Sequence, residues 1–211
     1  MLGNVMTGRA NHWEGVYRTK SEPEQSWHQS SPEASLAAIR EFAPGLNSRI
    51  IDVGAGNSRL ADGLLAAGYS EITLVDISEA ALEQTRERLG AVGSRVRFVA
   101  GDLLAIGELG TFDVWHDRAL FHFLTDPADR ARYAELAASS VTPGGHVVLM
   151  TFAADGPERC SGLPVSRDHG EGLAACFQPE FESVRAWRIE HITPWGTVQP
   201  FQAIVLRRAL G

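Results

Sequence analysis

The fold of this chain is decided by the stretch Ile50-Ile51-Asp52-Val53-Gly54-Ala55-Gly56-Asn57-Ser58, in which an apolar run leads into a glycine-rich turn. A second apolar run, residues 71–75, ends in an acid, Asp76, which is followed by Ile77. Glycines at such a turn let the backbone approach a ligand, and an acid after the next strand accepts hydrogen bonds from ribose hydroxyls. The pattern predicts a site for an adenosine-containing ligand at Gly54, Ala55, Gly56, Asp76 and Ile77.

Two departures from the dinucleotide-binding pattern indicate which ligand this is. Arg59 stands where the third glycine of that pattern would be, and Asp52 precedes the turn. A pyrophosphate prefers bare backbone amides and a positive field, which an acid opposes. An acid suits a ligand that carries an ammonium or a sulfonium group. The sequence therefore predicts S-adenosylmethionine as cofactor, with Asp52 beside it.

Length and charge restrict the class of protein. At 211 residues the chain fits one domain, so we expect a single domain over residues 1–211, with residues 1–30 as a lid-like extension. The net charge is −7 and the arginines are scattered, which argues against a nucleic-acid partner. No apolar run has the length of a signal peptide or a membrane span, so a soluble, cytoplasmic protein without a membrane partner is expected.

The cysteines are too few and too distant for a structural cluster. Cys160 and Cys176 predict neither a disulfide framework nor a zinc site. His122 lies six positions after His116, which is not the spacing of a helical metal pair. We therefore expect no metal.

Short apolar runs alternate with amphipathic segments along most of the chain. Such alternation predicts an α/β fold, a three-layer Rossmann-like arrangement with a mostly parallel sheet. The residues Thr142-Pro143-Gly144-Gly145 predict a turn before the fifth strand, and residues 181–191 and 198–208 predict an antiparallel hairpin at the sheet edge. The expected strands are 49–53, 71–75, 95–99, 112–115 and 146–152, and the expected helical segments are 32–42, 58–67, one from Ser78, and 117–139.

Five motifs in order resemble those of the class I S-adenosylmethionine-dependent methyltransferases. They are Asp52-Val53-Gly54-Ala55-Gly56, Asp76, Gly101-Asp102, Phe112-Asp113-Val114-Trp115 and Pro143-Gly144-Gly145. The resemblance implies a seven-stranded sheet whose last strand is antiparallel. It also implies that Asp102 accepts a hydrogen bond from the adenine amino group and that Leu103 flanks the adenine ring. Without the resemblance, Asp102 could cap a short segment and Leu103 could belong to the core.

Two groups within that family share further features with this chain. His116-Asp117-Arg118-Ala119-Leu120 with Trp13 and Trp27 resembles the thiol and halide methyltransferases related to thiopurine methyltransferase, and Trp13 with Asp117-Arg118 also resembles small protein-lysine methyltransferases. The glycine-proline-proline loop of the first group is only partly matched, by Gly162-Leu163-Pro164. The Asn-Pro-Pro-aromatic motif of amide and base N-methyltransferases is absent, so nucleobase methylation is not expected.

His116 and Asp117 are the candidate catalytic residues. A histidine titrates near neutrality and could deprotonate a thiol or amine acceptor. The alternatives are a hydrogen-bonded structural role for His116 and a helix N-cap for Asp117. Trp13, Tyr17 and Trp27 lie in a polar segment, where they could cover the sulfonium or merely seal the extension onto the core. We count Trp13 and Trp27 as candidate cofactor-binding residues.

The combined reading is a methyltransferase that transfers a methyl group to sulfur, nitrogen or oxygen of a small molecule or a protein, as a monomer or homodimer. Two alternatives stay open. One is a non-catalytic module that binds the cofactor or a partner on the same fold. The other is an NAD-dependent oxidoreductase, against which the missing third glycine, Asp52 and the terminal hairpin argue.

Overall fold

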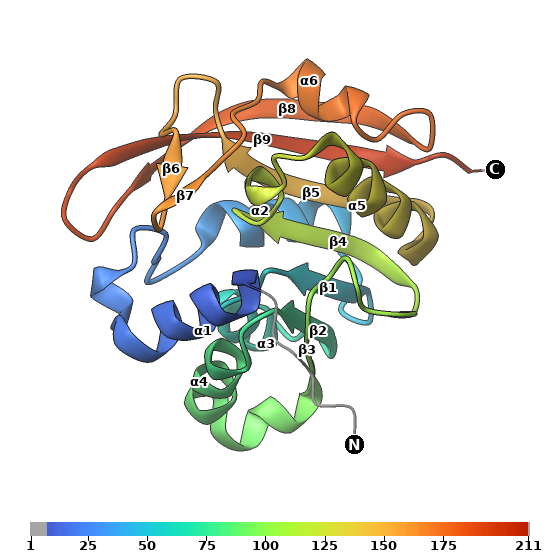
Figure 1. The fold of residues 1–211 in the computed structure, drawn as a ribbon. Coiled ribbons are helices and arrows are strands. Elements are labelled where there is room, and N and C mark those ends of the chain that lie inside the picture. Colours follow the sequence, from blue (N-terminus) through green and yellow to red (C-terminus); the bar gives the residue numbers. More distant parts are fainter. Residues whose placement is uncertain (1–7, 211) are drawn as a thin grey trace, which may run out of the picture.

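A computed structural model describes residues 8–210 of the chain; residues 1–7, which include the start of the predicted lid, and Gly211 lie outside the described residues. The described part is built around a seven-stranded sheet with the strand order β3-β2-β1-β4-β5-β9-β8 (Figure 1). Its strands are β1 (Arg49–Val53), β2 (Glu71–Asp76), β3 (Val96–Ala100), β4 (Phe112–Arg118), β5 (Val141–Phe152), β8 (Phe181–Ile192) and β9 (Val198–Arg208).

The sheet is parallel except for one strand. β1 pairs in parallel with β2 and β4, and β4 pairs in parallel with β5, whereas β9 is antiparallel to both β5 and β8. A short connection can join only antiparallel neighbours, and the turn at residues 193–197 between β8 and β9 is such a connection. The predicted α/β class and the antiparallel last strand are confirmed.

Helices cover both faces of the sheet because the central strands are buried on both sides. Ile50 packs into the apolar cluster that contains Leu36 and Leu64, while its neighbour Ile51 packs into the cluster on the other face with Tyr133. The helices are α1 (Gly8–Thr19), α2 (Glu33–Phe42), α3 (Leu60–Ala66), α4 (Glu79–Leu89), α5 (Pro127–Ser140) and α6 (Gly170–Ala175), with 3₁₀ turns at Glu22–Glu24, Gly90–Arg95 and Phe121–Phe123, and a small hairpin of β6 (Arg159–Cys160) and β7 (Leu163–Pro164).

The fourth strand and the fifth helix differ from the expected boundaries. Residues 117–139 were expected to be helical, but β4 continues to Arg118 because His116 pairs with Asp52 of β1 and Arg118 pairs with Met150 of β5. The helix α5 begins only at Pro127, where the Asp126 side chain accepts a hydrogen bond from the Ala128 amide at 2.8 Å. Pairing with β1 and β5 thus keeps these residues in the strand despite their local preference for a helix. The polar residues His116, Asp117 and Arg118 therefore lie at the carboxyl end of β4.

The predicted turn at residues 142–145 lies inside β5 rather than before it. Pairing jumps from Phe112–Val141 to Val114–His146, so the four residues between are an irregularity in the ladder. Gly144 has a φ of 79°, which a glycine adopts without strain. The expected turn chemistry is therefore present as a bulge within a longer strand.

The segment of residues 8–30, here called the lid segment, lies over the carboxyl ends of β1 and β2. Its helix α1 runs beside α4 (Figure 1). Ligands of such sheets bind at the carboxyl ends of the strands, where the strand order reverses. In this chain that point lies between β1 and β4.

Candidate functional site

A cavity opens at the carboxyl ends of the central strands, beneath the lid segment. Its floor comes from the turns after β1, β2 and β3, and its walls from the residues that follow β4. It is lined by Arg9, Trp13, Tyr17, Trp27, Gly54, Val75, Asp76, Ile77, Gly101, Asp102, Leu103, Leu104, Arg118, Ala119, Leu120, Phe123, Leu124 and Cys160.

The glycine turn after β1 requires glycine at two positions. Gly54 has a φ of 65°, and a Cβ atom there would lie 2.7 Å from Cβ of Leu120. Gly56 has a φ of 53°, and a Cβ atom there would lie 2.2 Å from Oη of Tyr17. Both backbone conformation and close packing exclude a side chain, so the turn is a surface that other groups approach closely.

Asp76 is held at the end of β2 by two backbone donors. The Gly56 amide donates to Oδ2 and the Ser78 amide donates to Oδ1, each at 2.8 Å. Burial raises the pKa of Asp76 to about 6, although these amides act in the opposite direction. Each carboxylate oxygen has a second lone pair. The carboxylate therefore keeps acceptor capacity toward the cavity that it lines.

Most of the predicted cofactor-binding residues meet in this cavity. Oδ1 of Asp102 accepts a hydrogen bond from the Leu104 amide at 3.0 Å. Asp76 likewise accepts a hydrogen bond from the amide two residues later, that of Ser78. Gly56 does not line the cavity but lies beneath Tyr17 and donates to Asp76. The predicted residues that line it are Trp13, Trp27, Gly54, Asp76, Ile77, Asp102 and Leu103. Their contact with a cofactor stays a prediction.

A smaller cavity adjoins the first and holds two further predicted cofactor residues, Asp52 and Ala55, as well as His116. The two cavities share part of their walls, because four residues line both: Gly54, Tyr17, Trp27 and Arg118. The smaller one is otherwise lined by His28, Gln29, Ser35, Asn57 and Ser58. The smaller cavity thus extends the candidate site from the carboxyl end of β1 toward the helix α2.

His116 is buried between two protein partners. Its Nδ1 lies 2.7 Å from Oδ1 of Asp52, and its Nε2 lies 2.9 Å from Oγ of Ser35. A carboxylate can only accept, so the imidazole donates to Asp52. The arrangement fixes the Asp52 carboxylate beside the glycine turn.

Asp117 points to the opposite face of β4 and lines neither cavity. It accepts hydrogen bonds from the Tyr133 hydroxyl at 2.6 Å and from the amides of Leu120 and Phe121. Burial raises its pKa to about 7, against the effect of these donors. Asp117 thus holds the turn that carries Leu120 and Phe123 into the cavity, as a capping residue would.

Aromatic side chains form the wall between the lid segment and the rest of the site. The Trp13 ring centroid lies 5.0 Å from that of Phe123 and 5.8 Å from that of Trp27, both edge-to-face. Tyr17 lies 6.0 Å from Trp27 in the same way. These separations are in the favourable range for aromatic pairs. The lid segment therefore closes the cavity with an apolar surface.

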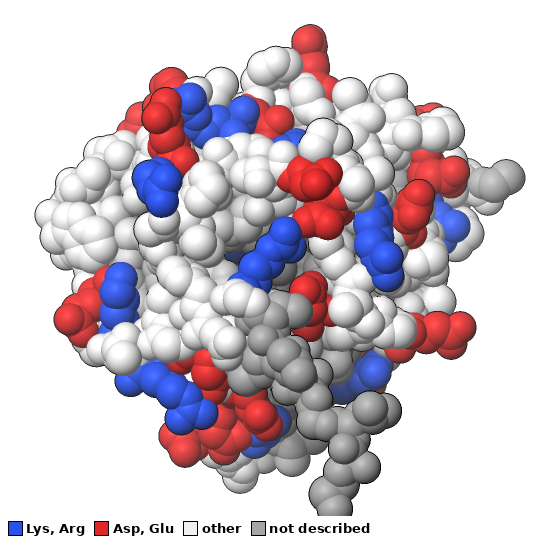
Figure 2. Space-filling model, viewed as in Figure 1, with Lys and Arg blue, Asp and Glu red and all other residues white. Residues whose placement is uncertain are grey.

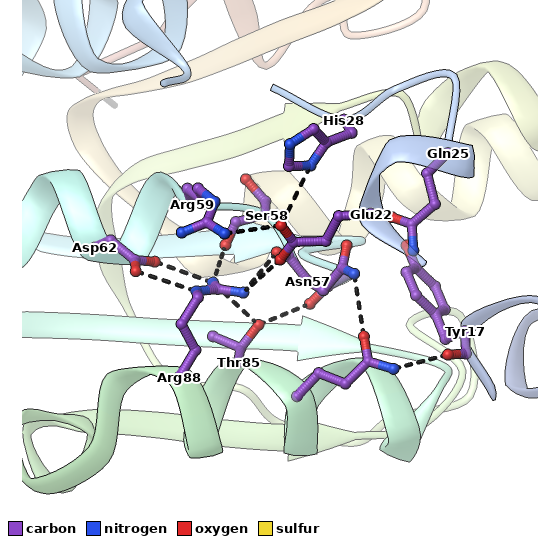
Figure 3. A network of polar contacts seen from close by, with 12 residues as sticks. Tyr17, Glu22, Gln25, His28, Asn57, Ser58, Arg59, Asp62, Thr85 and Arg88 are labelled. Carbon is purple, nitrogen blue, oxygen red and sulfur yellow. Dashed lines mark hydrogen bonds and ion pairs between the residues drawn. The ribbon is translucent and has the colours of Figure 1, made fainter. Parts of the chain in front are cut away.

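Polar contacts fasten the lid segment to the helices around the glycine turn (Figure 3). Glu22 pairs with Arg59 at 2.7 Å and with Arg88 at 3.6 Å. Arg88 in turn donates to the carbonyl oxygens of Asn57 and Ser58, directly after the turn. The Glu22 carboxylate of the lid segment thus pairs with Arg88, the same cation that holds the residues after the glycine turn.

The face of the molecule seen in Figure 2 carries positive and negative side chains interspersed. No patch of one sign dominates that view, in agreement with the scattered arginines of the sequence. Among residues 8–210, no helix is long and apolar enough to cross a membrane. Within the same residues no cluster of three or more His, Cys, Asp or Glu side chains could hold a metal ion.

Several cavity residues were not singled out from the sequence. Phe123 and Leu124 carry no local motif, because a single apolar residue is common in any core. Arg118 belongs to the quoted His-Asp-Arg motif, but only the structure shows that it lines both cavities. Arg9 enters from α1, where nothing in the sequence marks it.

Comparison with known proteins agrees with this geometry. Residues 50–145 match a family described as methyltransferase domain. The chain is 26% identical over 148 residues to the eEF1A lysine and N-terminal methyltransferase of Danio rerio, covering 68% of this chain and 21% of that protein. It is 32% identical over 127 residues to the ubiquinone biosynthesis O-methyltransferase of Ralstonia nicotianae, covering 59% of this chain and 51% of that protein.

The fold has close neighbours among solved structures. One, described as "Conversion of a Disulfide Bond into a Thioacetal Group during Echinomycin Biosynthesis", superimposes with a TM-score of 0.78 at 18% identity, covering 96% of this chain and 92% of that one. Residues 50–145 thus match a methyltransferase domain, and the chain shares the fold of that solved structure. This match agrees with the predicted class of enzyme, EC 2.1.1. The chain spans 21% and 51% of the two curated relatives described above.

Proposed function

We propose that this chain transfers a methyl group from S-adenosylmethionine to a small molecule with an apolar or aromatic body. One observation supports this most directly: a single cavity joins the acids Asp76 and Asp102 to an aromatic wall of Trp13, Trp27 and Phe123. The acids suit an adenosine, and the wall suits a flat apolar acceptor. The lid segment covers this cavity, which favours a small acceptor over a folded protein.

The donor groups of the site fit the cofactor. S-adenosylmethionine, when bound, supplies a methyl group activated by a sulfonium. Asp76 would accept the ribose hydroxyls, Asp102 the adenine amino group, and Asp52 would face the ammonium of the methionine end. Ile77 and Leu103 would enclose the adenine ring. The close approach at Gly54 leaves the backbone uncovered toward the cavity.

The chain would act mainly by holding the acceptor in line and excluding water. Alignment of reacting groups is worth up to ~7–11 kcal/mol. The hydrogen bonds of His116 and Asp117 to protein partners support positioning roles, in which His116 fixes Asp52 and Asp117 fixes the turn after β4. An acceptor that ionises near neutral pH, such as a thiol, would need no further base. This agrees with the sequence resemblance to the thiol methyltransferases.

The test is release of S-adenosylhomocysteine by the purified protein with three separate pools: small thiols and phenols, small amines, and the macromolecular fraction of a cell extract. We expect turnover with a small-molecule pool. Turnover with the macromolecular fraction alone would refute the small-molecule acceptor and favour a protein, such as the relative named for eEF1A lysine methylation.

Calorimetry with S-adenosylmethionine, S-adenosylhomocysteine and NAD separates the remaining alternatives. Binding of the first two without NAD, together with turnover, supports the proposal. Binding without turnover on any pool would favour a non-catalytic binding module. Saturable NAD binding with no S-adenosylmethionine signal would overturn the cofactor itself.

A further inference from the structure

Arg118 is the last residue of β4 and lines both cavities of the site. Its Nη1 donates to the Trp27 carbonyl oxygen at 2.9 Å, and its Cζ lies 5.2 Å from the ring centroid of Phe201. Its Nη2 is buried and has no hydrogen-bond partner among residues 8–210. One side of the guanidinium is thus anchored to the lid segment, and the other side is left to donate.

Arg118 has no direct ion pair with a described carboxylate, although the charge of Asp52 acts on it across the smaller cavity. Within residues 8–210 no Asp or Glu oxygen forms an ion pair with Arg118, and the Asp52 carboxylate is engaged by His116. Burial lowers the pKa of Arg118 to about 10, so the group is still protonated at neutral pH. The nearby Cys160 is no counter-ion, because burial raises the pKa of its thiol to about 11. A buried guanidinium whose Nη2 has no hydrogen-bond partner and which has no direct ion pair is costly, and this indicates an anionic ligand.

The smaller cavity shows what kind of anion would fit. Asp52 and Arg118 line it together, beside the glycine turn at Gly54 and Ala55. An acid and a base facing one small space complement a zwitterion, in which an ammonium and a carboxylate share one carbon atom. The α-amino acid end of a methionine is such a group.

We propose that Nη2 of Arg118 binds the α-carboxylate of the methionine end of S-adenosylmethionine, opposite Asp52. This inference rests on the proposed function, since it assigns a further residue to the same cofactor. A guanidinium suits a carboxylate because it donates in a planar fork. The same guanidinium holds the Trp27 carbonyl, so cofactor and lid segment would share one cation.

Calorimetry with three ligands and matched variants tests this assignment. The ligands are S-adenosylhomocysteine, its decarboxylated analogue, and 5′-methylthioadenosine, which lacks the whole amino acid end. Arg118→Met should weaken binding of S-adenosylhomocysteine by about tenfold or more. The same variant should change the affinity for the other two ligands by less than about threefold. Arg130→Met is the matched control, because Arg130 is also partly buried over an aromatic ring but pairs with Asp168 away from both cavities.

The wild-type protein supplies a test that does not depend on the variant folding. It should bind S-adenosylhomocysteine about tenfold or more tightly than the decarboxylated analogue. Equal affinity for the two, or an Arg118→Met protein with unchanged S-adenosylhomocysteine affinity, would overturn the assignment and leave Arg118 for an anionic group of the acceptor. Failure of the wild-type protein to bind any of the three ligands would instead refute the proposed cofactor.

Discussion

The ion pairs of Glu22 predict how firmly the lid segment is held. The Glu22 carboxylate lies 2.7 Å from the Arg59 guanidinium, 3.6 Å from that of Arg88 and 3.9 Å from Nδ1 of His28 (Figure 3). Burial lowers the pKa of His28, so this imidazole is neutral at pH 7 and adds little. Glu22→Gln keeps the shape of the side chain and removes only its charge.

The free energy that these ion pairs contribute to closure of the lid segment follows from the solvent exposure of their side chains. The Glu22 side chain is 29% exposed and that of Arg59 is 35% exposed, so the pairs are screened by solvent. Pairs of this kind are worth about 0.2–1 kcal/mol each, which gives a total of about 1 kcal/mol for the two arginines. Loss of about 1 kcal/mol raises the opening equilibrium of the segment about fivefold.

Amide hydrogen exchange measures this opening directly. In the Glu22→Gln protein, residues 20–28 should exchange about fivefold faster than in the wild type, with little change in α5. S-adenosylhomocysteine should slow exchange in both proteins, because a ligand that prefers the closed form shifts the population toward it. Glu83→Gln is the matched control, since the ion pair that Glu83 forms among residues 8–210 is with Arg86 on the same helix, α4.

Two results would refute this reasoning. Equal exchange of residues 20–28 in the wild type and in Glu22→Gln would show that the ion pairs contribute nothing to closure. If amide exchange of residues 20–28 became faster by the same factor in Glu22→Gln and in Glu83→Gln, the cause would be a general effect of charge and not the ion pairs of Glu22. High salt offers a further check, because it should accelerate exchange in the wild type and leave Glu22→Gln nearly unchanged.

Two further predictions concern the predicted cofactor site. Gly56→Ala should weaken S-adenosylhomocysteine binding more than tenfold, because its Cβ would lie 2.2 Å from Oη of Tyr17. Gly90→Ala also introduces a side chain at a positive φ, 56°, but no atom lies within 4 Å of the added Cβ, so its affinity for S-adenosylhomocysteine should stay close to that of the wild type. Equal losses of affinity by calorimetry in the two variants would refute the packing argument. The pKa of Asp76, raised to about 6 from an ordinary 3.8, means that the folded state keeps a proton that the unfolded chain releases, so this residue should lower stability as pH rises from about 4 to 6. Denaturant midpoints across that range should show this slope in the wild type and lose it in Asp76→Asn.

The parts of this molecule that local sequence could predict are those fixed by local chemistry. The glycine turn at Gly54 follows from backbone conformation, and Asp76 follows from its position after an apolar run. The α/β class and the antiparallel hairpin at the end of the chain could be inferred, because apolar runs alternate with amphipathic segments until the last two apolar runs, which have no helix between them. The end of β4 could not be inferred, because its last three residues are held by pairing with β1 and β5 rather than by their own preferences.

The contacts that complete the site join residues far apart in the chain. Arg118 meets the Trp27 carbonyl 91 positions away, and His116 meets Ser35 81 positions away. No periodicity or spacing marks such pairs, since each side chain is ordinary in its own segment. Their positions emerge only when the sheet brings β4 beside α2 and beneath the lid segment.

The lid segment and the predicted cofactor site are one structural unit, because each end of the site is bonded to the lid. At the ribose end, Glu14 accepts hydrogen bonds from the Ser78 hydroxyl at 2.8 Å and the Ala80 amide at 3.2 Å, next to Asp76. At the methionine end, Arg118 holds the Trp27 carbonyl. We therefore expect a ligand that fills the cavity to enter while these bonds are open and to be enclosed when they form. Closure then removes water from the cavity, and the charged contacts of Asp76 and Arg118 become stronger in the drier surroundings. A segment that only sealed the core would need only its aromatic contacts. Because hydrogen bonds also join it to residues at both ends of the site, we expect its closure to depend on whether the site holds a ligand.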